Sequence, residues 1–148
     1  EHQILKGTEM NSQEIAEKSS EIMWESDSAS KWFGMSIESV APGYAQLTLN
    51  VEKHHCNGHG NCHGAISFAL ADSAFAFACN SYNERCVAQH NMITYLRPIS
   101  SGDVLKAEAR EVSRSRNSGI YDVCVKNQEG KVCVEMRGFS RKVEGSLF

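Results

Sequence analysis

The stretch from His63 to Cys79, HGAISFALADSAFAFAC, constrains the fold more than any other part of the chain. It is rich in Ala, Leu and Phe and apolar all the way round, which is typical of a helix enclosed on every side rather than of an amphipathic surface helix. The run is shorter than the roughly 20 apolar residues that span a bilayer, and a carboxylate lies near its middle. We therefore expect a core helix with the rest of the chain wrapped around it.

Asp72 is the one carboxylate in this stretch. An ionised carboxylate in apolar surroundings is unfavourable unless it is paired, hydrogen-bonded or placed at a cavity that performs chemistry. With an unperturbed pKa of about 3.9, an aspartate is mostly ionised near neutral pH and can attack a carbonyl or activate water. We predict that Asp72 is the reactive group. The alternative is a structural Asp that belongs to a packing network.

The segment before this helix predicts one further helix and a hairpin. Asn11 and Glu14 have capping-box spacing, so a helix is expected from about Ser12 to Lys31, within an N-terminal helical segment 12–33. Alternating apolar residues then predict two half-buried strands that meet at a turn, Ala41-Pro42-Gly43.

Four more strand-like segments follow the apolar helix, at 86–96, 104–112, 120–126 and 132–143. The order of helix, two strands, long apolar helix and four strands indicates an α+β protein, in which a curved antiparallel β-sheet wraps around the long helix. A length of 148 residues suits one domain, so we expect a single domain over 1–148. Residues 1–11 are expected to be disordered or foreign to it.

Charge and cysteine usage limit the partners and the compartment. A net charge of −3 gives no general attraction to nucleic acid or to an anionic membrane, so a phosphate-bearing ligand needs a local basic patch. We expect no signal peptide and no membrane span. Six cysteines could pair, but several lie in the central helix or in strand-like runs of a chain with an ample core. Reduced thiols in the cytoplasm are therefore expected.

Three segments carry a resemblance to a known family: NGHGNCHG at 57–64, LADSAFA at 70–76 and YLRP at 95–98. Together they resemble the hotdog-fold acyl-CoA thioesterases, most closely the branch of phenylacetic acid degradation, over residues 44–143. The most specific feature is a His-Gly step with an Asp eight residues later on an apolar helix. The resemblance implies a hotdog fold and hydrolysis of an aromatic acyl-CoA, of phenylacetyl or hydroxyphenylacetyl type, to free acid and coenzyme A.

The resemblance also implies catalytic roles. Asp72 corresponds to the nucleophile or general base, the Gly64 amide to the group that polarises the thioester carbonyl, and Asn57 to the residue that places the water or carboxylate. Some relatives carry a Ser after the helix to orient the water, and Ala88 occupies that position here. No cofactor is expected beyond coenzyme A, which is part of the substrate.

Elementary chemistry agrees with these roles. Thioester hydrolysis passes through a tetrahedral oxyanion, and free amides at a helix N-terminus, aided by the helix dipole, are suitable donors to it. Plainer roles remain open: Gly64 could permit close packing and Asn57 could shape the loop. His63 is expected to hold the Gly64 turn by hydrogen-bonding the backbone, ahead of transferring a proton.

Further residues are candidates for binding the substrate. Arg97, Arg114 and Arg116 could hold the phosphates of coenzyme A, and Phe68, Phe75 and Phe77 could line an apolar slot for the acyl group or belong to the core. The run HHCNGHGNCH at 54–63 has enough soft ligands for zinc but lacks paired metal-ligand spacing, so no metal site is expected.

Two other function classes remain open, because fold alone does not decide activity. One is a dehydratase or hydratase that uses His63 and Asp72 on acyl thioesters. The other is a non-catalytic acyl-CoA sensor, against which the carboxylate of Asp72 argues.

The spacing of Gly64 and Asp72 predicts self-association. Eight residues of helix separate them by about 12 Å, whereas both must lie within about 3 Å of the atoms that react. Two antiparallel helices related by a two-fold axis would bring Gly64 and Asn57 of one subunit to Asp72 of its partner. We therefore expect a homodimer, and the resemblance adds a homotetramer.

Overall fold

The computed structural model describes residues 9–148, so the predictions for residues 1–8 lie outside the described residues. In chain order the elements are α1 (Ser12–Glu25), α2 (Ser28–Phe33), β1 (Met35–Ala41), β2 (Tyr44–Asn50), a short 3₁₀ helix η1 (Lys53–His55), α3 (Gly64–Cys79), β3 (Cys86–Tyr95), β4 (Val104–Arg114), β5 (Ser118–Lys126) and β6 (Val132–Lys142).

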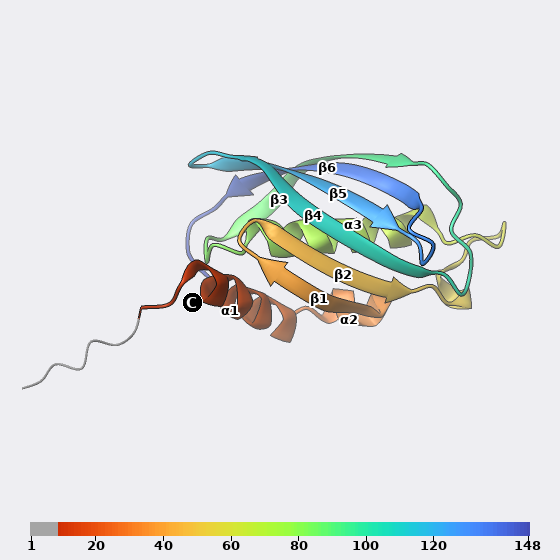
Figure 1. Cartoon of the computed structure of the whole chain (residues 1–148), viewed down its shortest axis with the longest axis horizontal. Coiled ribbons are helices and arrows are strands. Elements are labelled where there is room, and N and C mark those ends of the chain that lie inside the picture. The colour runs from red at the N-terminus through yellow and green to blue at the C-terminus, as the bar shows by residue number, and fades with distance from the viewer. Residues whose placement is uncertain (1–8) are drawn as a thin grey trace, which may run out of the picture.

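The strands form one antiparallel sheet of six, in the order β1-β2-β4-β5-β6-β3. Figure 1 shows α3 lying along one face of the sheet, with α1 and α2 beside β1. Alternate residues of the central strands point toward α3 and are fully buried, for example Leu47 on β2, Ala107 on β4 and Val123 on β5. The predicted α+β hotdog architecture, with its curved sheet and central helix, is confirmed.

The N-terminal segment is two helices, so the prediction of one continuous helix is wrong. The predicted capping box is present, because Asn11 Oδ1 accepts from the Glu14 amide at 2.8 Å. Asp27 interrupts the helix because its side chain caps a second one, accepting from the Ser30 amide at 2.9 Å. The Ser30 hydroxyl also lies 2.9 Å from that of Ser73, which ties α2 to the central helix.

The central helix has a buried face and an open one. Leu70, Ala74 and Phe77 are at most 2% exposed, as expected for a core helix. The opposite side is incompletely covered within one chain, and we call it the open strip of α3: Ala65, Phe68, Ala69, Asp72 and Ala76. The expectation of a helix enclosed on every side is therefore wrong for the single chain.

The described residues contain no helix that is long and apolar enough to cross a membrane. All six cysteines are unpaired.

Candidate active site

The first turn of α3 presents an available amide. His63 is the N-cap, and its Nδ1 accepts from the Ala65 amide at 2.9 Å. The His63 amide donates to the carbonyl of His55 at 2.8 Å. Within residues 9–148 the Gly64 N–H has no hydrogen-bond partner. A helix N-terminus with a free N–H is suited to an anion or a developing oxyanion, so the backbone here has the donor that the sequence predicts.

Tyr95 packs directly on Gly64. Its hydroxyl donates to the Gly64 carbonyl at 3.1 Å, and its ring lies 3.2 Å from where a Cβ at position 64 would stand. Gly64 and Ser67 line a hollow of about 310 Å³ together with Asn61, Cys62 and the segment 95–99. Arg97 lies in that segment. Of the three arginines that could hold the phosphates of coenzyme A, Arg97 is therefore the one that the structure brings to the N-terminal end of α3.

Asn57 shapes the loop before α3. Its side-chain Oδ1 accepts from the backbone amides of His59 at 2.9 Å and Asn61 at 3.3 Å. The backbone amide of Asn57 donates to the Asn61 carbonyl at 2.7 Å. The carbonyl oxygen of its side chain is therefore engaged in loop structure, while the amide nitrogen of that side chain makes no hydrogen bond within the part of the chain that is described.

Asp72 lies on the open strip of α3 and is half-buried. Asn91 Nδ2 on β3 donates to Asp72 Oδ1 at 3.0 Å. Burial raises the pKa of Asp72 above its usual value, and the hydrogen bond from Asn91 acts in the opposite direction because it favours the ionised form. The carboxylate is thus oriented by one neighbour while its environment makes it more basic than an exposed Asp.

Asn91 is the residue that sequence reasoning missed. Its Oδ1 is the one buried side-chain oxygen or nitrogen without a partner among the described residues, which sets it apart from ordinary packing. The pairing of β3 with β6 shifts register between Ala88 and His90, so a bulge changes which residues of β3 face α3. Regular alternation along the strand would put Asn91 on the same face as Val87, and only the bulge separates them.

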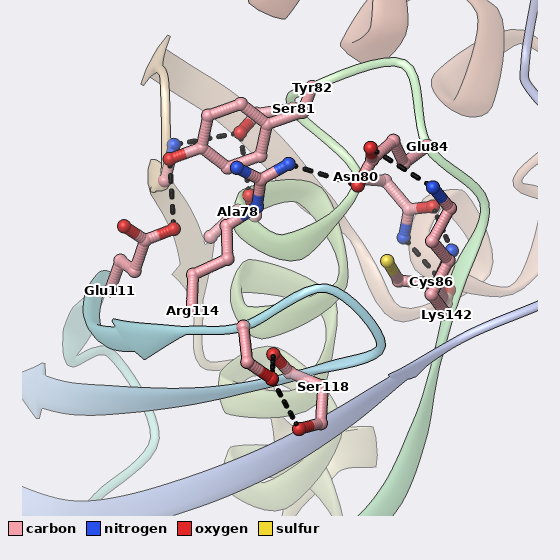
Figure 2. A network of polar contacts seen from close by, with 12 residues as sticks. Ala78, Asn80, Ser81, Tyr82, Glu84, Cys86, Glu111, Arg114, Ser118 and Lys142 are labelled. Atoms are coloured by element: carbon pink, nitrogen blue, oxygen red, sulfur yellow. Dashed lines mark hydrogen bonds and ion pairs between the residues drawn. The ribbon is translucent and has the colours of Figure 1, made fainter.

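Arg114 and Arg116 lie at the other end of α3. Figure 2 shows the Arg114 guanidinium against the Tyr82 ring, 3.6 Å from its centroid, and bonded to Glu84 at 2.9 Å. Lys142 bonds the same carboxylate at 3.1 Å. Arg116 is exposed in the turn between β4 and β5. The charge of Arg114 is therefore already paired within the chain.

The candidate phenylalanines separate into core and surface. Phe75 is fully buried against Tyr121 and Gly138, and a Cβ at position 138 would stand 2.9 Å from its ring. Phe77 is also buried and packs near Trp24, with ring centroids 6.2 Å apart. Phe68 is half-buried on the open strip. Of the three, Phe68 alone is placed where a ligand could reach it in the single chain.

The histidines near α3 have structural partners. His55 Nδ1 accepts from the Glu52 amide at 3.0 Å, so its Nε2–H donates to the Phe33 carbonyl at 2.8 Å. His63 caps α3. Within residues 9–148, no group of three or more His, Cys, Asp or Glu side chains is arranged to hold a metal ion.

Comparison with known proteins gives concordant matches. Residues 59–134 match the family model described as the thioesterase superfamily. The chain is 39% identical to acyl-coenzyme A thioesterase PaaI of Escherichia coli K12 over 84% of this chain and 89% of that one. It is 34% identical to a putative esterase of Archaeoglobus fulgidus, over 84% of this chain and 81% of that one.

Among solved structures, the E. coli PaaI protein from the phenylacetic acid degradation operon superimposes with a TM-score of 0.91 at 37% identity, covering 92% of this chain and 99% of that one. A mutant form of the phenylacetic acid degradation protein PaaI from Thermus thermophilus gives a TM-score of 0.74 at 34% identity, over 77% of this chain and 97% of that one.

Proposed function

Because the chain belongs to the thioesterase superfamily, we propose that it hydrolyses an aromatic acyl-CoA to free acid and coenzyme A at a site shared by two subunits. The chain is an acyl-CoA thioesterase of the PaaI type. One observation carries the choice of residues: α3 holds both a free Gly64 amide at its N-terminus and an oriented, half-buried Asp72 on its open strip.

The reaction needs few groups. The Gly64 N–H donates to the thioester oxygen and stabilises the negative charge that develops there. Asp72 either attacks the carbonyl carbon or takes a proton from a water whose oxygen forms that bond. The C–S bond then breaks and the thiolate of coenzyme A leaves, to be protonated from solvent. Where Asp72 has attacked directly, this leaves a mixed anhydride between the acyl group and Asp72, which water hydrolyses to the free acid and the restored carboxylate. His63 positions Gly64 through the helix cap, and Asn57 holds the loop that precedes it.

The geometry of one chain supports a shared site. Gly64 and Asp72 stand about 12 Å apart along α3, so one thioester cannot contact both within a subunit. On the side of the sheet that carries α3, the open strip and the neighbouring edge strand β3 leave apolar side chains uncovered, among them Phe68 and Tyr95. A second copy of the chain placed antiparallel on this strip would cover them and would bring Asp72 of the partner subunit to Gly64. We propose a homodimer, with pairing into a homotetramer as in the family pattern, and a cytoplasmic location that suits its unpaired thiols.

The substrate prediction has a direct kinetic test. We expect a higher kcat/KM for phenylacetyl-CoA than for long straight-chain acyl-CoAs, in keeping with the operon from which the similar E. coli protein comes. Release of free thiol from a panel of acyl-CoAs measures this preference. A clear preference for long straight chains would reject the aromatic substrate. The same panel separates the other function classes, since a sensor binds without releasing thiol and a dehydratase consumes β-hydroxyacyl-CoA without releasing it.

Replacing Asn91 with Ala is expected to move the acid limb of the kcat/KM profile to higher pH. The ionised form of Asp72 is the active one, so activity falls as the pH drops through its pKa. The lost hydrogen bond had lowered that pKa, whereas burial, which raises it, remains. Thr94→Ala, an exposed change on the same strand, should leave the limb in place. An acid limb that does not move in Asn91→Ala would contradict the role given to Asn91.

A further inference from the structure

Two hollows flank the N-terminal turn of α3. The first is the hollow of about 310 Å³ that contains Gly64, Tyr95 and Arg97. The second, of about 110 Å³, is lined by Trp32, Phe33, His54, His55 and Ile66. The two hollows share no residue, and their linings differ in chemistry. The first combines a cation with polar and apolar groups, whereas the second is built mainly from aromatic rings.

The second hollow, which we call the aromatic hollow, lies close to the Gly64 amide. On one side its wall residue His55 accepts a hydrogen bond through its carbonyl from the amide of His63, at 2.8 Å. On the other side its wall residue Ile66 stands two positions after Gly64 on the first turn of α3. A carbonyl held at Gly64 is thus within reach of the hollow for a short substituent.

Hydrogen bonds and ring contacts hold the inner wall of the aromatic hollow. Both ring nitrogens of His55 are hydrogen-bonded, to Glu52 and Phe33. The His54 ring lies against it, with centroids 4.1 Å apart, and the Trp32 ring stands edge-on to Phe33 at 5.1 Å. Trp32 is nevertheless 79% exposed, the highest exposure among the large apolar side chains described. An indole this exposed, packed edge-on against Phe33, offers its ring to contact another ring.

We propose that the aromatic hollow is the acyl subsite and receives a single six-membered aromatic ring attached to the thioester carbonyl through a short link, with Trp32 as its outer wall. The inference rests on the proposed function and adds the residues that select the substrate. The hollow, at about 110 Å³, is of the same order as the roughly 150 Å³ protein cavity that binds benzene, and it opens to solvent beside Trp32. The coenzyme A portion then extends from the opposite side of Gly64, through the hollow that holds Arg97.

The test compares two substrates in one set of variants: phenylacetyl-CoA, which carries the ring, and butyryl-CoA, which does not. In Trp32→Ala the ratio of kcat/KM for phenylacetyl-CoA over butyryl-CoA should fall by about tenfold, the order of loss expected for one aromatic contact and its buried area. Trp32→Phe, which keeps a ring, should recover most of that ratio. Val112→Ala removes another exposed apolar side chain, 51% exposed on β4, and should leave both rates unchanged.

The outcomes are distinguishable. If the unmodified protein hydrolyses phenylacetyl-CoA but the ratio in Trp32→Ala stays within twofold, the subsite is wrong and the proposed function stands. If kcat/KM in Trp32→Ala falls equally for both substrates and size-exclusion chromatography shows that the oligomer has dissociated, Trp32 is a subunit contact. That result would also overturn the subsite. If the unmodified protein releases no thiol from any acyl-CoA, the proposed function itself fails.

Discussion

Replacing Asp72 with Asn is expected to lower kcat for thioester hydrolysis by about a hundredfold or more, because the change removes the nucleophile or general base. The variant should fold, since Asn is nearly the same size and its side-chain oxygen can still accept from Asn91, as Asp72 does at 3.0 Å. KM should change little, because the proposed role of Asp72 lies in the chemical step rather than in holding coenzyme A.

Asp122→Asn is the matched control. It makes the same chemical change in an exposed carboxylate on β5, which pairs with Arg137 at 2.7 Å on the face of the sheet away from α3. This control should retain full activity. If Asp72→Asn turns over within a few-fold of the unmodified enzyme, Asp72 is not the reactive group. In the unmodified enzyme, single turnover in ¹⁸O-labelled water identifies direct attack, since label enters the Asp72 carboxylate only when water hydrolyses an anhydride that this carboxylate has formed.

The sequence is most informative where one residue pattern has one structural solution. An apolar run with helical residue types between strand-like segments is best buried by a sheet wrapped around it, so α3 and the succession of strands along the chain are predictable. Asp72 stands out for the same reason, because a carboxylate in such a run requires a physical explanation. The turn at Pro42-Gly43 is predictable from its residue types, and Gly43 has a φ of 68° there.

The sequence is less informative where a local contact decides between close alternatives. The side chain of Asp27 can cap a new helix or remain in a continuous one, and the break between α1 and α2 follows from that single choice. The bulge in β3 places Asn91 beside Asp72 without any residue type that announces it. The burial of Phe75 depends on Gly138, which lies far away in sequence and leaves room for the ring. Each depends on a contact that the residue pattern does not encode.

The second large effect is expected at Gly64. Gly64→Pro removes the N–H that is proposed to bind the oxyanion, and proline suits this position because it is the first residue of a helix. The preceding residue, His63, has φ −60° and ψ 136°, which is the conformation that a following proline favours. Loss of one oxyanion donor lowers kcat by about a hundredfold to a thousandfold. Gly64→Ala is the matched control, since it adds the same Cβ beside Tyr95 but keeps the N–H, and it should lose far less activity.

These two inactive variants together test whether subunits share the site. In a heterodimer of Asp72→Asn with Gly64→Pro, one site combines the intact Gly64 of the first subunit with the intact Asp72 of the second, while the other site carries both defects. Random pairing makes about half of the dimers mixed, so co-expression should restore roughly a quarter of the unmodified activity. Two different affinity tags would isolate the mixed dimers, whose specific activity should be about half. Proven heterodimers without activity, or full activity in a demonstrated monomer, would show that each subunit holds a complete site. The separation of about 12 Å between Gly64 and Asp72 along α3 would then be bridged within one subunit.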